Sequence, residues 1–331
     1  MDIDAYVAAC GGQWARLDHL ARRRRLSGAE ADELLDLYQR VSTHLSHVRS
    51  ASPDPALVAH LSALLARARL RADASDTSSW GDVLRFFTHT FPAALYRMRV
   101  WWLTVLAVSL VVAVIAAWWM VENPGYIAAR LSSAEIDQYV GHDFENYYSE
   151  YAHHEFATLV WVNNAWVAAQ CIGMGALGLP TVYVLLMNVL NLAAGAALMI
   201  GEGRGDLFFG LILPHGLLEL TAIFVAGAVG LRLFWSWIHP GARTRSSAFA
   251  AEGRTAATVA LGLVAVLLVS GVIEGFVTPS SLPTAARIAI GVIAEALFFA
   301  YVFVLGRRAV AQGATGDLEE KDRGTLLPVI D

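Results

Sequence analysis

The chain has 331 residues and a net charge of −5, with 56% hydrophobic and only 16% charged residues. A soluble domain usually carries about a quarter charged residues, and here residues 1–99 hold 13 of the 24 basic and 11 of the 29 acidic residues. These values exclude a soluble globular enzyme, a disordered chain and a nucleic-acid-binding protein with a basic face. They predict an all-α, polytopic helical membrane protein with a soluble N-terminal domain.

The N-terminal region has the pattern of a small helical bundle. Residues 4–71 carry apolar side chains at helical spacings of three and four, in three segments. Ser27 can cap the second segment, and Pro55 can begin the third. We therefore predict that residues 1–79 form a cytoplasmic three-helix domain and a polar linker. The basic run Arg22–Arg25 is interpreted as a solvated or membrane-facing helix end rather than a nucleic-acid contact, because the region is nearly neutral.

Residues 80–99 differ from both neighbours. Phenylalanines at 86, 87 and 91 are interleaved with arginines at 85, 97 and 99. This mixture predicts an interfacial amphipathic helix on the anionic cytoplasmic leaflet, interrupted near Pro92.

Six apolar segments of about twenty residues follow, each long enough to cross a bilayer. Pairs of tryptophans bracket the first segment at the spacing expected of two aromatic belts. The second segment is the weakest, because Asn163, Asn164 and Gln170 interrupt it. Together they predict a six-span transmembrane domain at residues 100–306. The segments are Val100–Val121, Ala157–Gly175, Thr181–Ile200, Leu207–Leu231, Ala256–Gly275 and Ala285–Leu305.

The charges of the connecting loops predict the orientation. Residues 122–155 hold seven acidic residues and one basic residue, Arg130. The connection after the fourth span and the tail at residues 307–331 carry arginines instead. Six spans place all these arginines on one side, so the positive-inside rule predicts cytoplasmic N- and C-termini in a bacterial inner membrane. Five spans would place the tail outside.

The loop between the first two spans is predicted to contain a helix. Ser132 and Glu135 have the spacing of a capping box. The helix predicted at residues 132–155 has an aromatic face and an acidic face, so it suits either the outer membrane surface or a lid packed on neighbouring spans.

Catalytic signatures are missing from the sequence. It has no Walker A loop, no Gly-x-Ser-x-Gly and no His-Glu-x-x-His motif. Adjacent histidines at 153 and 154, near Glu150, are a weak metal motif. We therefore expect a non-enzymatic protein without a cofactor, a catalytic residue or a metal ligand.

Polar residues within the spans are the candidate functional groups. Pro214 removes a backbone hydrogen bond, which predicts a kink or break in the fourth span. His215 and Glu219 are four residues apart and share a helix face, with Glu219 about 20 Å into the span. The candidate cluster comprises Asn163, Asn164, Asn188, Asn191, Pro214, His215, Glu219, Arg232, Glu274 and Glu295.

An intramembrane carboxylate costs about 2.5–3.5 kcal/mol on insertion scales, so it must face the bundle and find a partner. Three interpretations stay open. The polar groups can hold spans together or hold a partner's helix, they can bind a proton or a substrate for transport, or they can catalyse a reaction. The last lacks a nucleophile or a third metal ligand.

Two blocks of sequence resemble a known family. The segment Pro214-His215-Gly216-Leu-Leu-Glu219 and the segment Ile273-Glu274-Gly275-Phe276-Val277-Thr278-Pro279-Ser280 are similar to the two signatures of the stage II sporulation protein M (SpoIIM) family. Asn188 and Asn191 match its polar third span. The N-terminal part resembles the long, actinobacterial-type members, so the resemblance covers nearly the whole chain up to about Arg308.

The resemblance implies an integral membrane protein without established enzymatic chemistry. The sporulation member acts as a membrane scaffold for peptidoglycan-degrading proteins during engulfment, and genes for long members often lie beside those for MoxR-type ATPases and RDD-type membrane proteins. The expected function is a scaffold or adaptor of a cell-envelope complex; the alternative is a proton-coupled small-molecule transporter or channel. Expected partners are the lipid bilayer, envelope proteins of these kinds and a second copy of the chain, but no nucleic acid.

Overall fold

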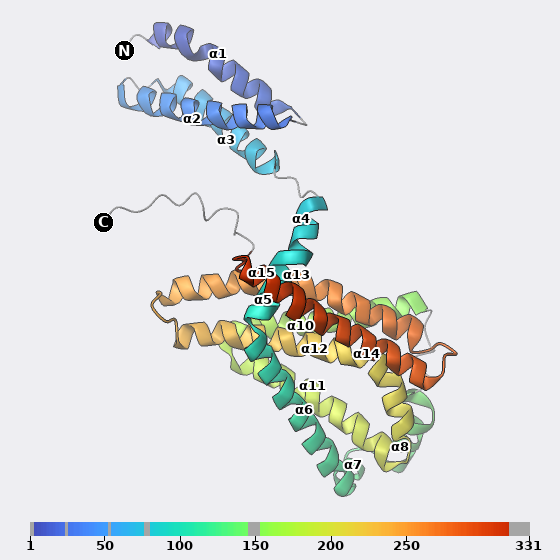
Figure 1. Cartoon of the computed structure of the whole chain (residues 1–331). Coiled ribbons are helices and arrows are strands. Elements are labelled where there is room, and N and C mark those ends of the chain that lie inside the picture. The colour runs from blue at the N-terminus through green and yellow to red at the C-terminus, as the bar shows by residue number, and fades with distance from the viewer. Residues whose placement is uncertain (1–2, 24–25, 52–53, 76–79, 145–152, 318–331) are drawn as a thin grey trace. The chain divides into compact units, whose positions relative to one another are not determined.

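The computed structural model describes residues 3–23, 26–51, 54–75, 80–144 and 153–317 (Figure 1). Across these residues the regular structure is entirely helical, as the composition predicts. The chain divides into two compact units, Met1–Val83 and Leu84–Asp331. Each unit has a hydrophobic core of its own.

Three helices form the N-terminal unit: α1 (Ile3–Arg22), α2 (Gly28–Ala51) and α3 (Pro55–Ser75). Leucines from all three helices are fully buried between them, which is why the spacing of three and four is maintained along each helix. Before α2, the Ser27 hydroxyl accepts a hydrogen bond from the Glu30 backbone and the Glu30 carboxylate accepts one from the Ser27 backbone. This reciprocal cap fixes where α2 begins.

Five helical segments of the described residues are long and apolar enough to cross a membrane. The helix α10 (His153–Gly173) coincides with the weakest predicted span and falls outside this set, although it packs against α12 and α13. The six-span count therefore stays a prediction. The five segments are α6 (Arg99–Glu122), α11 (Leu179–Gly201), α12 (Gly205–Ile238), α13 (Arg245–Val272) continued by η4 (Ile273–Val277), and α14 (Thr284–Ala300) continued by η5 (Tyr301–Gly306) and α15 (Arg307–Ala311).

The helix α12 lies at the centre of the membrane unit. It contacts α6, α10, α11, α13 and α14, and Figure 1 shows it running among them. Every residue from Thr221 to Gly230 is buried. Pro214 lies inside α12 without ending it, so the break that we considered does not occur.

Glycines allow backbones to touch around α12. A Cβ atom at Gly230 would overlap the carbonyl oxygen of Cys171, and one at Gly175 would lie 2.5 Å from the Gly230 Cα. A Cβ at Gly291 of α14 would likewise lie 2.6 Å from the carbonyl oxygen of Leu213. Because real Cβ atoms do not come this close, the helix spacings depend on these glycines.

The segment that we predicted to lie on the membrane surface packs differently. It forms α4 (Trp80–Arg85), the π-helical turn η1 (Phe86–Thr90) and α5 (Phe91–Arg97). Residues Phe91–Leu95 are buried in the core of the membrane unit rather than lying on its surface. The reason is a notch at Gly262 of α13, where the Phe91 ring occupies the space of a side chain.

The loop after α6 contains α7 (Gly125–Ala128), α8 (Ser133–Gln138) and the π-helical turn η2 (Tyr139–Asp143). The Ser132–Glu135 capping box is present. Val140 and Phe144 are buried, and the Phe144 ring stacks on Phe208 of α12 at a centroid distance of 5.6 Å. Of the two interpretations of this helix, the structure favours the lid. The predicted continuation through Tyr147 and Tyr151 lies outside the described residues.

The glycine contacts predict a stability difference. Gly230→Ala should destabilise the protein by about 1–3 kcal/mol, because the added methyl group would force α10 away from α12. Gly253→Ala is the matched control, since a Cβ at this helical glycine meets nothing within 4 Å and the exchange should be neutral or slightly stabilising. Thermal unfolding midpoints in detergent measure both effects; equal midpoints for the two variants would contradict the packing described here.

Candidate intramembrane polar site

His215 is buried on α12 and is contacted from α13 and η4. Its Nδ1 atom lies 3.2 Å from the hydroxyl of Thr278, and its Nε2 atom lies 3.6 Å from a carboxylate oxygen of Glu274. Its backbone carbonyl accepts a hydrogen bond of 3.0 Å from the hydroxyl of Ser270. Both ring nitrogens therefore face polar groups of other segments.

Glu219 lies one turn after His215 on the same face of α12, as the spacing predicts. The side chains of Asn164 and Ser270 lie near its carboxyl group. One ligand-type atom each from His215, Glu219 and Glu274 lies within 4.8 Å of the others. We call these three residues the His-Glu-Glu cluster.

The cluster contains polar atoms without partners. The Oε2 atoms of Glu219 and Glu274 are buried, and neither has a hydrogen-bond partner among the described residues. Leaving such a group unsatisfied costs about 1–3 kcal/mol. The cluster is therefore under-satisfied by protein atoms.

The turn between α13 and α14 closes the cluster on one side. The guanidinium of Arg287 donates hydrogen bonds of 2.5 Å to the carbonyl oxygen of Thr278 and 3.1 Å to the hydroxyl of Thr284. Thr284 also packs on Gly210 of α12, where a Cβ would lie 2.9 Å from its methyl group. These contacts hold η4 against α12 and bring Glu274 to His215.

A polar cavity of about 220 Å³ opens beside the cluster. Asn188 and Asn191 of α11 line it together with His215 and Glu219. Asn191 also lines a pocket of about 730 Å³ beneath α8 and η2. Polar groups therefore extend from the acidic loop, past Asn191, to the His-Glu-Glu cluster.

The other predicted site residues are separated from the cluster or lie at its edge. Asn163 is exposed, whereas Asn164 faces Glu219. Pro214 is buried and its carbonyl contacts Gly291. Glu295 accepts a 2.7 Å hydrogen bond from the hydroxyl of Thr221, forming a pair of its own.

Arg232 belongs to a different polar region. Its guanidinium makes two hydrogen bonds, of 2.7 and 3.1 Å, to the carboxylate of Glu252. Arg243 approaches the same carboxylate at 3.9 Å. Arg232 therefore connects the last turns of α12 to α13 and does not join the cluster.

The sequence pattern did not identify three further residues of the site: Ser270, Thr278 and Arg287. Thr278 had a detectable signal, because it follows Glu274 by four residues and so shares its helix face. Ser270 and Arg287 had none, since their roles depend on how α13 and α14 meet α12.

The contact between Thr278 and His215 raises the question of nucleophilic catalysis. A hydroxyl, an imidazole and a carboxylate in this order resemble a catalytic triad. However, Thr278 is fully buried, and it is not among the residues that line the cavity. A substrate in the cavity has no access to this hydroxyl, so the arrangement supports structure or binding rather than acyl transfer.

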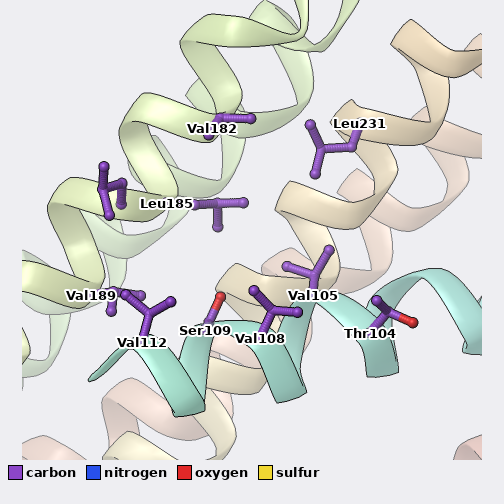
Figure 2. Close-up of a pocket in the computed structure, with 10 residues that line it drawn as sticks. Thr104, Val105, Val108, Ser109, Val112, Val182, Leu185, Val189 and Leu231 are labelled. Atoms are coloured by element: carbon purple, nitrogen blue, oxygen red, sulfur yellow. The ribbon is translucent and has the colours of Figure 1, made fainter. Parts of the chain in front are cut away.

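A second hollow in the membrane unit is chemically different. Figure 2 shows a groove of about 360 Å³ lined by side chains of α6, α11 and α12. The lining is aliphatic apart from the hydroxyls of Thr104 and Ser109. Such a groove suits lipid chains, and its described lining has no charged or imidazole side chain for binding an ion.

Two family models match this chain, one in each of its two units. A family model described as Stage II sporulation protein M matches residues 106–279, and a model described as a domain of unknown function (DUF8413) matches residues 4–72. No curated protein and no solved structure matches the chain. The first match covers more than half of the chain and includes the entire His-Glu-Glu cluster with Thr278. The chain belongs to the Stage II sporulation protein M (SpoIIM) family and is a membrane protein of that family.

Proposed function

We propose that this chain is a non-enzymatic scaffold or adaptor of a bacterial cell-envelope complex. The observation that carries the proposal is its construction from two units with separate cores, each matching a family model of its own. A helical unit attached to a membrane unit can bind a partner on one side of the membrane while the spans bind others. In this proposal, both termini are cytoplasmic and the protein lies in the inner membrane.

The packing of α12 supports a scaffold over a channel. Beyond Glu219, α12 is buried at every residue from Thr221 to Gly230. Glycines there bring α12 into backbone contact with α10, and a Cβ at Gly227 would lie 2.6 Å from the side chain of Leu185. A conduit for ions needs polar, hydrated walls along this stretch, whereas the stretch is buried and closely packed.

Transport is the second candidate, because the polar cavity reaches His215 and Glu219. A transporter that alternates between conformations needs one open side at a time. The cavity and the pocket beneath the lid would then belong to a state open toward the acidic loop.

Cysteine labelling tests the six-span orientation. In a background of Cys10→Ser and Cys171→Ala, cysteines at positions 133, 246 and 281 probe three loops with an impermeant maleimide on intact cells. Six spans predict labelling at 133 and 281 and protection at 246. Labelling at 133 and 246 with protection at 281 is the five-span pattern, in which α10 does not cross, and would contradict the proposed topology.

Deletion of residues 1–79 tests the proposed role of the N-terminal unit in binding cytoplasmic partners. Because that unit folds around its own core, its loss should leave the membrane unit intact by gel filtration. We expect cytoplasmic partners, recovered after mild crosslinking and quantified by mass spectrometry against the full chain, to fall at least tenfold, while envelope partners of the spans remain. No reproducible partner for the full chain, or the same partners for both forms, contradicts the role proposed for this unit.

Proteoliposome flux separates the scaffold from the transporter. Under the scaffold proposal, wild type, Glu219→Gln and the control Glu295→Gln all give background flux of protons and small solutes. Saturable flux that Glu219→Gln abolishes and Glu295→Gln retains would establish transport instead. Gel filtration of each variant checks that it is folded.

A further inference from the structure

The His-Glu-Glu cluster has the donor atoms of a metal site. It combines one imidazole with two carboxylates, and one ligand-type atom from each residue lies within 4.8 Å of the other two. Two ligand atoms on one tetrahedral zinc ion lie roughly 3.3–3.6 Å apart, given bonds of about 2.0–2.2 Å. The separation of 3.6 Å between His215 Nε2 and Glu274 Oε1 fits this spacing and is too long for a hydrogen bond.

The surroundings of His215 also match those of a ligand. Metal-binding histidines usually donate their second ring N–H to an oxygen, which fixes the tautomer and the ring orientation. Here Nδ1 lies 3.2 Å from the Thr278 hydroxyl, so Nε2 is directed toward Glu274. Thr278 is held in turn by Arg287, through its carbonyl oxygen.

The unpartnered carboxylate oxygens of the cluster are free to act as cation ligands. Glu274 is 4% exposed, yet its Oε2 atom and that of Glu219 have no hydrogen-bond partner among the described residues. If both carboxyls are ionised beside a neutral imidazole, they carry two negative charges, which one divalent cation would neutralise. Buried charges in proteins are stabilised by such pairing or by metal coordination.

The cavity supplies an open coordination position and a route into the site. His215 and Glu219 line the cavity, whose other polar groups are Asn188 and Asn191. The pocket that shares Asn191 carries Glu135 and Asp143 with one basic residue, Arg130, so its acidic groups outnumber its basic ones and favour the approach of a cation. Three protein ligands with one open position are typical of exchangeable metal sites.

We propose that His215, Glu219 and Glu274 bind one divalent first-row transition-metal ion, with a water or small ligand from the cavity as the fourth ligand. Mixed imidazole and carboxylate donors favour such ions, with Zn²⁺ as the probe, over Mg²⁺ and Ca²⁺, which prefer oxygen-only sites. Sequence spacing does not reveal this ligand set, because Glu274 is 55 or more residues from the other two.

Metal content tests the proposal on the full chain, purified in detergent with a histidine-free tag, stripped with EDTA, reloaded with Zn²⁺ and desalted. Wild type should retain about one zinc per chain. His215→Ala and Glu274→Gln should each lower the affinity at least tenfold. In Thr278→Val, loss of the hydroxyl contact to His215 Nδ1 should lower the zinc affinity about 10–100-fold.

Two variants serve as controls, and Co²⁺ provides a second readout. Glu295→Gln removes a partly buried carboxyl outside the cluster, and His154→Ala removes an exposed histidine of the weak metal motif; both should keep the metal. Co²⁺ in the wild-type site should give visible absorption bands of a four-coordinate ion, which Glu274→Gln abolishes. Wild type without zinc after reloading, or wild-type zinc affinity in a folded Glu274→Gln protein, overturns the proposal. If His215→Ala fails to fold, the zinc affinity of the isosteric Glu274→Gln variant still tests the proposal.

Discussion

The enclosure of α12 is the constraint on which the membrane unit depends. Five helices surround it, so its side chains have little access to water, and every polar group on it must find a partner within the protein. Glu295 satisfies Thr221 in this way, and Ser270 satisfies the His215 carbonyl. Among the described residues of the membrane unit, this arrangement leaves unpaired the buried Oε2 atoms of Glu219, Glu274 and Glu295 and the buried Nε atom of Arg287.

The close helix packing and the positions of the polar groups both depend on glycines at the contacts with α12. Glycine allows α14 to touch the backbone of α12 near Pro214 and allows α10 to touch it near Gly230. These contacts fix how far each helix can slide along α12. The position of η4 follows from them, and with it the distance between Glu274 and His215.

The two units raise separate questions about function, because each matches a different family model. Membership of the SpoIIM family rests on the membrane unit, whereas the N-terminal unit matches a domain without an assigned function. The proposed scaffold role would account for the presence of both units in one chain. A bound metal would add to this by holding α12 and η4 together beneath the lid, so that the polar cavity would be a binding site with one opening rather than a passage.

The sequence by itself determined the helical class, five of the six predicted apolar spans, the three N-terminal helices and the pairing of His215 with Glu219, because these depend on local periodicity. It placed Phe91 on the membrane surface, and it named Glu274 as a candidate residue without determining that Glu274 lies next to His215. Both depend on contacts between distant segments: a notch at Gly262 receives the Phe91 ring, and the turn held by Arg287 brings Glu274 to His215. Only the tertiary structure decided these positions, because the packing distances between helices depend on steric fit, which periodicity does not encode.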